Sequence, residues 1–137
     1  MDESPIAQLL GAIDKLDLEA AAALFARDAR LLSLDGRTAM GIEAVRELLA
    51  EFLDLLRSSA HRITAQWHQE NVWIAEVEAT YELKDRLKVT LPRAFVLRDG
   101  PDGLAELHAY GAHERSLAEH RTGEEGMRIG GRWIPPL

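Results

Sequence analysis

Apolar side chains in the first 57 residues recur every three or four positions, which is the spacing of one face of a helix. This pattern predicts three helices, over residues 5–16, 17–27 and 42–57. Ser4 followed by Pro5 is typical of a helix start, because the hydroxyl can cap the first turn and the proline ring suits it. Asp17 has the same capping character before the second helix.

From residue 61 onward the period changes to two, which is typical of strands with one buried face. The alternation predicts four strands, over residues 61–69, 73–83, 87–97 and 104–114. Asp35-Gly36 predicts a turn that joins two short strands between the second and third helices. Pro92 indicates a bulge or a sheet edge.

The order of these elements predicts an α+β domain, in which the helices cover one face of a curved sheet that is mainly antiparallel. A curved sheet with helices across its concave face encloses a conical space, and such a space suits a small molecule. We expect this domain to span residues 1–116 and residues 117–137 to form a tail. The apolar residues 133–137 indicate that the tail is partly docked.

The composition of the chain excludes several classes of protein. The chain has 137 residues, a net charge of -7 and no cysteine, so one domain without disulfides, thiolate chemistry or a cysteine-ligated metal is expected. No basic cluster suggests nucleic-acid binding, and no apolar run is long enough to span a bilayer. The first residues do not resemble a signal peptide, so we expect a cytoplasmic protein.

Neither metal-ligand spacing nor a nucleotide-binding glycine motif is present, so we expect no metal and no cofactor. His61 and His68 are an odd number of residues apart, and strict alternation would place them on opposite faces of the sheet.

Three stretches, over residues 17–29, 35–45 and 89–110, resemble the nuclear transport factor 2-like superfamily, which includes ketosteroid isomerase, limonene epoxide hydrolase and the SnoaL-like polyketide cyclases. The resemblance implies a cone-shaped, cystatin-like fold with three N-terminal helices packed on the sheet. It also implies a homodimer and a pocket for a small hydrophobic molecule inside the cone. In several of these enzymes the last strand has an aromatic-x-Asp motif, whereas Tyr110-Gly111-Ala112 stands here. The expected carboxylate is therefore absent from this strand.

His108 and Tyr110 are the catalytic candidates, since they share one face of the last strand. A histidine can exchange protons near neutral pH, and a tyrosine hydroxyl can donate a hydrogen bond to a developing oxyanion. The same alternation fits a pair on the outer face of the sheet, at a dimer surface or on a pocket wall.

Four further residues are candidates for binding the ligand: Trp67, Tyr81, Arg93 and Phe95. The aromatic side chains lie on the apolar faces of their strands and could line either a core or a cavity. Arg93 shares the parity of Leu91 and Phe95 if Pro92 does not shift the register, and would then anchor a carbonyl or carboxylate group. A bulge at Pro92 would turn Arg93 to the surface.

Two functions fit these observations. The first is a small-molecule enzyme of the isomerase, cyclase or hydratase type, which acts on a hydrophobic ligand in the cone. The second is a non-catalytic binding or assembly module that forms dimers through the outer face of the sheet.

Overall fold

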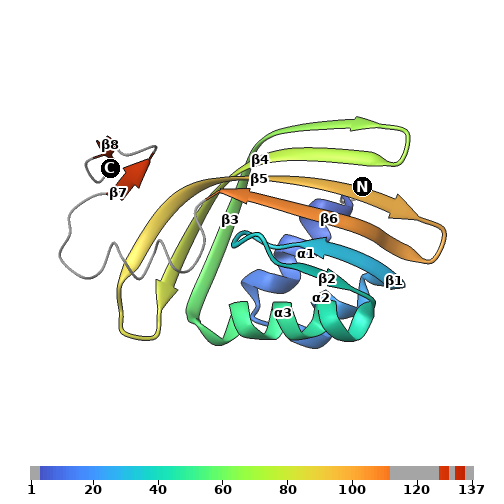
Figure 1. Ribbon diagram of the computed structural model, residues 1–137, viewed down its shortest axis with the longest axis horizontal. Helices are drawn as coiled ribbons and strands as arrows, with labels where there is room; N and C mark the ends of the chain where they lie inside the picture. The colour runs from blue at the N-terminus through green and yellow to red at the C-terminus, as the bar shows by residue number, and fades with distance from the viewer. Residues whose placement is uncertain (1–3, 112–126, 130–131, 135–137) are drawn as a thin grey trace.

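The protein forms three helices and a six-stranded sheet, seen in a computed structural model that describes residues 4–111, 127–129 and 132–134 (Figure 1). In chain order, the elements of this domain are α1 (Pro5–Asp14), α2 (Leu18–Ala23), β1 (Phe25–Leu32), β2 (Thr38–Met40), α3 (Ile42–Asp54), β3 (Leu56–Gln69), β4 (Val72–Leu83), β5 (Lys88–Gly100) and β6 (Gly103–Gly111). The predicted helix caps are present. The Ser4 hydroxyl accepts a hydrogen bond from the Ala7 amide, and the Asp17 carboxylate accepts one from the Ala20 amide. The predicted α+β class is confirmed.

The sheet has the strand order β2-β1-β6-β5-β4-β3 and is curved and open. β1 pairs with β6 in parallel, and the other pairings of this sheet are antiparallel. The sheet is therefore mixed. The alternation of residues alone gave no indication of this parallel pairing. The pairing also brings the N-terminal hairpin against the last strand of the meander, which closes the core.

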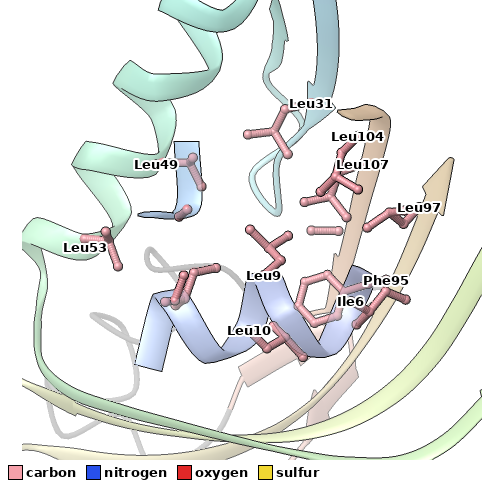
Figure 2. Packing of buried hydrophobic residues seen from close by; sticks show 14 of the residues in the cluster. Ile6, Leu9, Leu10, Leu31, Leu49, Leu53, Phe95, Leu97, Leu104 and Leu107 are labelled. Atoms are coloured by element: carbon pink, nitrogen blue, oxygen red, sulfur yellow. The ribbon is translucent and has the colours of Figure 1, made fainter. Parts of the chain in front are cut away.

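The three helices lie across the concave face of the sheet (Figure 1). Leu9 of α1 points between Leu49 and Leu53 of α3 on one side and Leu104 and Leu107 of β6 on the other (Figure 2). All five side chains are buried. Each large apolar side chain that is fully buried stabilises the folded state by about 1.5–3 kcal/mol, so this core is the main source of the stability of the domain.

The second helix is shorter than the sequence predicts. It ends at Ala23 instead of near Arg27, and β1 begins at Phe25. The carbonyl oxygen of Leu24 accepts a hydrogen bond of 2.9 Å from the Leu104 amide, and Phe25 pairs with Leu104 of β6. Pairing with the distant strand therefore overrides the helical spacing of these two apolar residues.

Two register features decide which side chains face the core. A bulge in β3 shifts its register against β4 between Ile63 and Ala65, so the strict alternation of β3 does not continue past Ile63. The pairing of β5 with β4 runs through Pro92 without a shift. The bulge indicated at Pro92 is therefore not found, and the residues that follow keep their parity.

The predicted tail falls mostly outside the described residues, as does the predicted domain boundary at residue 116. Within it, β7 (Met127–Ile129) and β8 (Arg132–Ile134) pair as an antiparallel hairpin. Among the described residues, no helix is long and apolar enough to cross a membrane.

Candidate functional site

A buried histidine lies at the centre of the candidate site. The side chain of His61 on β3 is only 1% exposed, and both of its ring nitrogens are within hydrogen-bond distance of another polar side chain. Its Nδ1 lies 2.6 Å from the Asp14 Oδ1 atom, and its Nε2 lies 2.8 Å from the Tyr81 hydroxyl. His61 pairs with Ala79, whose small side chain belongs to the core, so the imidazole points to the concave side of the sheet.

Asp14 reaches this histidine from the last residue of α1. It follows Leu10 by four residues, so it continues the buried helical stripe to the point where the helix meets β3. Its Oδ2 atom accepts from the backbone amide of His61 at 3.0 Å, and its Oδ1 atom accepts from the Ser59 hydroxyl at 2.8 Å. The carboxylate is thus held by β3 on both oxygens, while its side chain keeps 27% exposure.

Tyr81 completes a chain of hydrogen bonds that runs from Asp14 through His61. Its ring is packed edge-on against Phe52 of α3, with 5.4 Å between centroids. The guanidinium carbon of Arg93, on β5, lies 5.0 Å from the centre of the same ring. Arg93 is 3% exposed and Tyr81 is 1% exposed, so a buried cation lies against the tyrosine.

Burial sets the protonation of these groups. Loss of solvent lowers the pKa of His61 below its ordinary value; the Asp14 carboxylate opposes this shift and the charge of Arg93 adds to it. Burial raises the pKa of Tyr81 to about 12, against the opposing effect of Arg93. A neutral His61 then donates its Nδ1 hydrogen to Asp14 and accepts the Tyr81 hydroxyl hydrogen at Nε2.

Three of the residues singled out in the sequence face this site. Tyr81 and Arg93 are part of it, and Phe95 is buried beside it, with its ring centroid 6.4 Å from that of His61. Arg93 faces inward because the register is continuous through Pro92. Their contact with a ligand stays a prediction.

The other three lie on the convex face. The bulge after Ile63 turns Trp67 outward, where it pairs with Ile74 and is 53% exposed. His108 and Tyr110 alternate with the buried Leu107 and Ala109, and their side chains are 3.1 Å apart, from Nδ1 to the hydroxyl oxygen. The structure therefore does not bring this pair together with His61, and its proposed catalytic role stays a prediction.

Sequence reasoning missed Asp14 and His61 as a pair. The signal was present in part, because His61 shares the parity of Ile63 and Asp14 is in phase with Leu10. Their contact joins residues 47 positions apart and depends on how α1 crosses the sheet.

A pocket of about 490 Å³ lies away from this site, between the β3–β4 and β5–β6 turns. The apolar side chains of α1 are buried on the concave side of the sheet. No three histidine or acidic side chains of the described ranges are grouped so that they could hold a metal ion.

Comparisons with known proteins agree with the fold. The SnoaL-like domain family matches residues 6–103. No curated protein matches the chain. A protein from Catenulispora acidiphila with a ketosteroid isomerase-like fold, crystallised with trimethylamine, superposes with a TM-score of 0.75 at 18% identity, over 86% of this chain and 92% of that chain.

Two further solved structures have similar folds. A protein assigned to the SnoaL-like polyketide cyclases, from Shewanella denitrificans, gives a TM-score of 0.71 at 10% identity and covers 84% of this chain and 92% of its own. An LEH-like epoxide hydrolase from M. tuberculosis gives 0.67 at 13% identity, over 79% of this chain and 80% of that chain. At these identities the likeness concerns the fold.

Proposed function

Since the chain belongs to the SnoaL-like domain family, we propose that it is a small-molecule enzyme that moves protons on a mostly apolar ligand. The isomerase, cyclase and hydratase reactions considered above share one step, the transfer of a proton at or next to an oxygen-bearing carbon. The observation that carries the proposal is the hydrogen-bonded chain from Asp14 through His61 to Tyr81.

We assign a role to each member of this chain. His61 is the acid–base group, because a neutral imidazole can take a proton at Nε2. Asp14 fixes the orientation of the ring and stabilises the imidazolium that forms. Tyr81 is the group that meets the ligand: its oxygen receives the proton from the ligand carbon while its own proton passes to His61.

The surroundings support an apolar ligand. The aromatic rings of Phe52 and Phe95 border the site. Phe52 is half-buried on α3 and packs edge-on against the Tyr81 ring. The Tyr81 hydroxyl is buried against His61, so surrounding side chains must move before a ligand can reach it. Arg93 would stabilise negative charge that develops on a ligand oxygen.

Deuterium exchange tests this function with a simple ketone. We expect the protein to accelerate exchange of the α-hydrogens of 2-tetralone in D₂O over the buffer rate, followed by proton NMR. Loss of a general acid–base group typically costs 10²–10⁴-fold, so His61→Gln should lower the added rate about 100-fold or more. Tyr81→Phe should have a similar effect.

The matched controls are His108→Gln and Tyr110→Phe, which remove the same chemical groups from the convex face. Exchange that survives His61→Gln but is lost in His108→Gln would overturn the assignment in favour of the convex pair.

Saturation-transfer NMR of 2-tetralone separates binding from turnover. Binding without exchange in the unmodified protein would favour a non-catalytic binding module.

A homodimer formed through the convex face is the second candidate function, as an assembly module. A cross-strand row of Trp67, Ile74, Val96 and His108 supports it, because these paired positions run across four strands on that face. Trp67 and Ile74 are 53% and 39% exposed. Adjacent large apolar side chains that are exposed, such as these two, are typical of a surface that another molecule covers.

A further inference from the structure

The pocket between the two hairpin turns is built from side chains that the proposed reaction does not use. The β3–β4 turn and the β5–β6 turn lie at the same end of the sheet (Figure 1). The amide of Asp99 donates to the Asn71 carbonyl oxygen at 2.8 Å, and the Asn71 side-chain amide donates to the Asp99 carbonyl oxygen at 3.1 Å. These two bonds hold the turns at a fixed separation.

One wall of the pocket is a flat aromatic stack. The rings of His68 and Trp73 are 3.6 Å apart at their centres and 7° from parallel, and both line the pocket. Trp73 packs against the core, and the His68 Nε2 atom lies 2.7 Å from the Glu70 carbonyl oxygen, so both rings are held in place. The β3 bulge puts His68 on this concave side, where strict alternation would not place it.

The remaining chemistry of the pocket is acidic. Glu70 and Asp99 line it, and its other lining residues, Asn71, Gly100 and Pro101, carry no charged side chain. The neighbouring cation, Arg98, pairs with Glu106 at 3.1 Å and is not among the lining residues. Glu70 has a φ of 53°, in a region where glycine is favoured, so this turn holds a carboxylate at a position with a conformational cost.

We propose that this pocket binds a small planar organic cation, of the amidinium or guanidinium class. A flat cation can lie against the pocket side of the stacked His68–Trp73 pair, in which the imidazole covers one face of the indole, and can pair its N–H groups with the Glu70 and Asp99 carboxylates. The pocket has a volume of about 490 Å³ and is widely open to solvent, so a bound cation would stay partly exposed. Trp73 is six residues from Ala79, the partner of His61, or about 20 Å along β4, so the two sites are separate.

Benzamidine and benzamide test the proposal, because they share their shape and differ in charge. With the ¹⁵N-labelled full chain, we expect benzamidine to shift the amides of residues 70, 71, 99 and 100 and the Trp73 indole signal in a saturable way. Benzamide should bind at least about ten-fold more weakly, as expected if the charge supplies a large part of the affinity. Trp73→Phe identifies the indole signal.

Two single variants and one control locate the binding. Glu70→Gln and Asp99→Asn should each raise the Kd of benzamidine about three-fold, and the double variant about ten-fold. Asp102→Asn removes a carboxylate from the same β5–β6 turn that does not line the pocket, so it should leave the Kd unchanged. Equal binding of benzamide, a Kd insensitive to Glu70 and Asp99, or no saturable shift at these residues would overturn the proposal. None of these readouts depends on His61 or on deuterium exchange.

Discussion

At the scale of single residues, two effects act in opposite directions on the pKa of His61. Burial favours the neutral ring, while the contact with Asp14 favours the protonated ring, and the net effect lowers the pKa of His61. The structure therefore keeps the imidazole neutral near neutral pH but places next to it the carboxylate that an imidazolium requires. This is the arrangement expected of a histidine that gains and releases a proton during a reaction.

The same shift makes the stability of the fold depend on pH. Below the ordinary histidine value of 6.5, the unfolded chain binds a proton at residue 61 before the folded chain does. We therefore expect the free energy of unfolding to fall as the pH is lowered from 7.5 through 6.5 to the lower pKa of the folded state. Urea unfolding at each pH should show a smaller decrease for His61→Gln than for the unmodified protein.

His108→Gln is the control for this measurement, since it removes a half-exposed histidine from the convex face. The decrease should be smaller in His61→Gln than in His108→Gln, because only the first variant removes the buried imidazole. An identical pH dependence in His61→Gln would contradict the lowered pKa of His61.

The sequence predicts part of this site, and the missing part has a clear cause. Alternation places Tyr81, Arg93 and Phe95 on one side of their strands, because the β4–β5 pairing has no irregularity. It fails for Trp67 and His68, because the bulge in β3 reverses the faces and leaves no strong mark in the sequence. The contact of Asp14 with His61 depends on the packing of a helix end on a strand, which local pattern does not determine.

At the scale of elements, the position of β1 depends on one close approach of two backbones. Gly103 begins β6 with a φ of 127°, and a Cβ atom built there would lie 2.9 Å from the Leu24 oxygen and 3.0 Å from the Ala26 nitrogen. This approach allows the parallel pairing of β1 with β6 and cuts α2 short at Ala23. The order of helices and strands follows from sequence periodicity, but this parallel pairing joins residues about 80 positions apart and does not.

Gly103→Ala should therefore destabilise the protein strongly. Gly36→Ala is the matched control, because Gly36 also has a positive φ, of 88°, but nothing lies within 4 Å of its added Cβ. We expect about 1–2 kcal/mol for Gly36→Ala from the backbone conformation alone, and about 3 kcal/mol or more for Gly103→Ala, since backbone atoms of β1 must also move. Equal losses in urea unfolding would show that the close approach is not required.

At the scale of the whole molecule, the two faces of the sheet have different chemistry. The concave face carries the core, the His61 site and the pocket at the hairpin turns. The convex face carries ion pairs such as Arg62 with Glu78 and Arg98 with Glu106. Between them runs the cross-strand row of Trp67, Ile74, Val96 and His108, in which Trp67 and Ile74 are large and exposed. An enzyme site on one face and an assembly surface on the other are compatible, so the two candidate functions can be tested separately.

The cross-strand row predicts a dimer whose two copies bury it against each other. We expect light scattering coupled to size exclusion to give twice the mass of one chain, and Ile74→Glu to give a monomer, because it would bury a charge at the centre of the interface. A hot-spot residue at the centre of an interface contributes about 2 kcal/mol or more, so the Kd of the dimer should rise about 30-fold or more if Ile74 is one. Leu55→Glu is the matched control: Leu55 is also 39% exposed but follows α3, away from the row, and its variant should remain a dimer. A monomeric unmodified protein, or a dimer that loses equal affinity in both variants, would contradict an interface at this row.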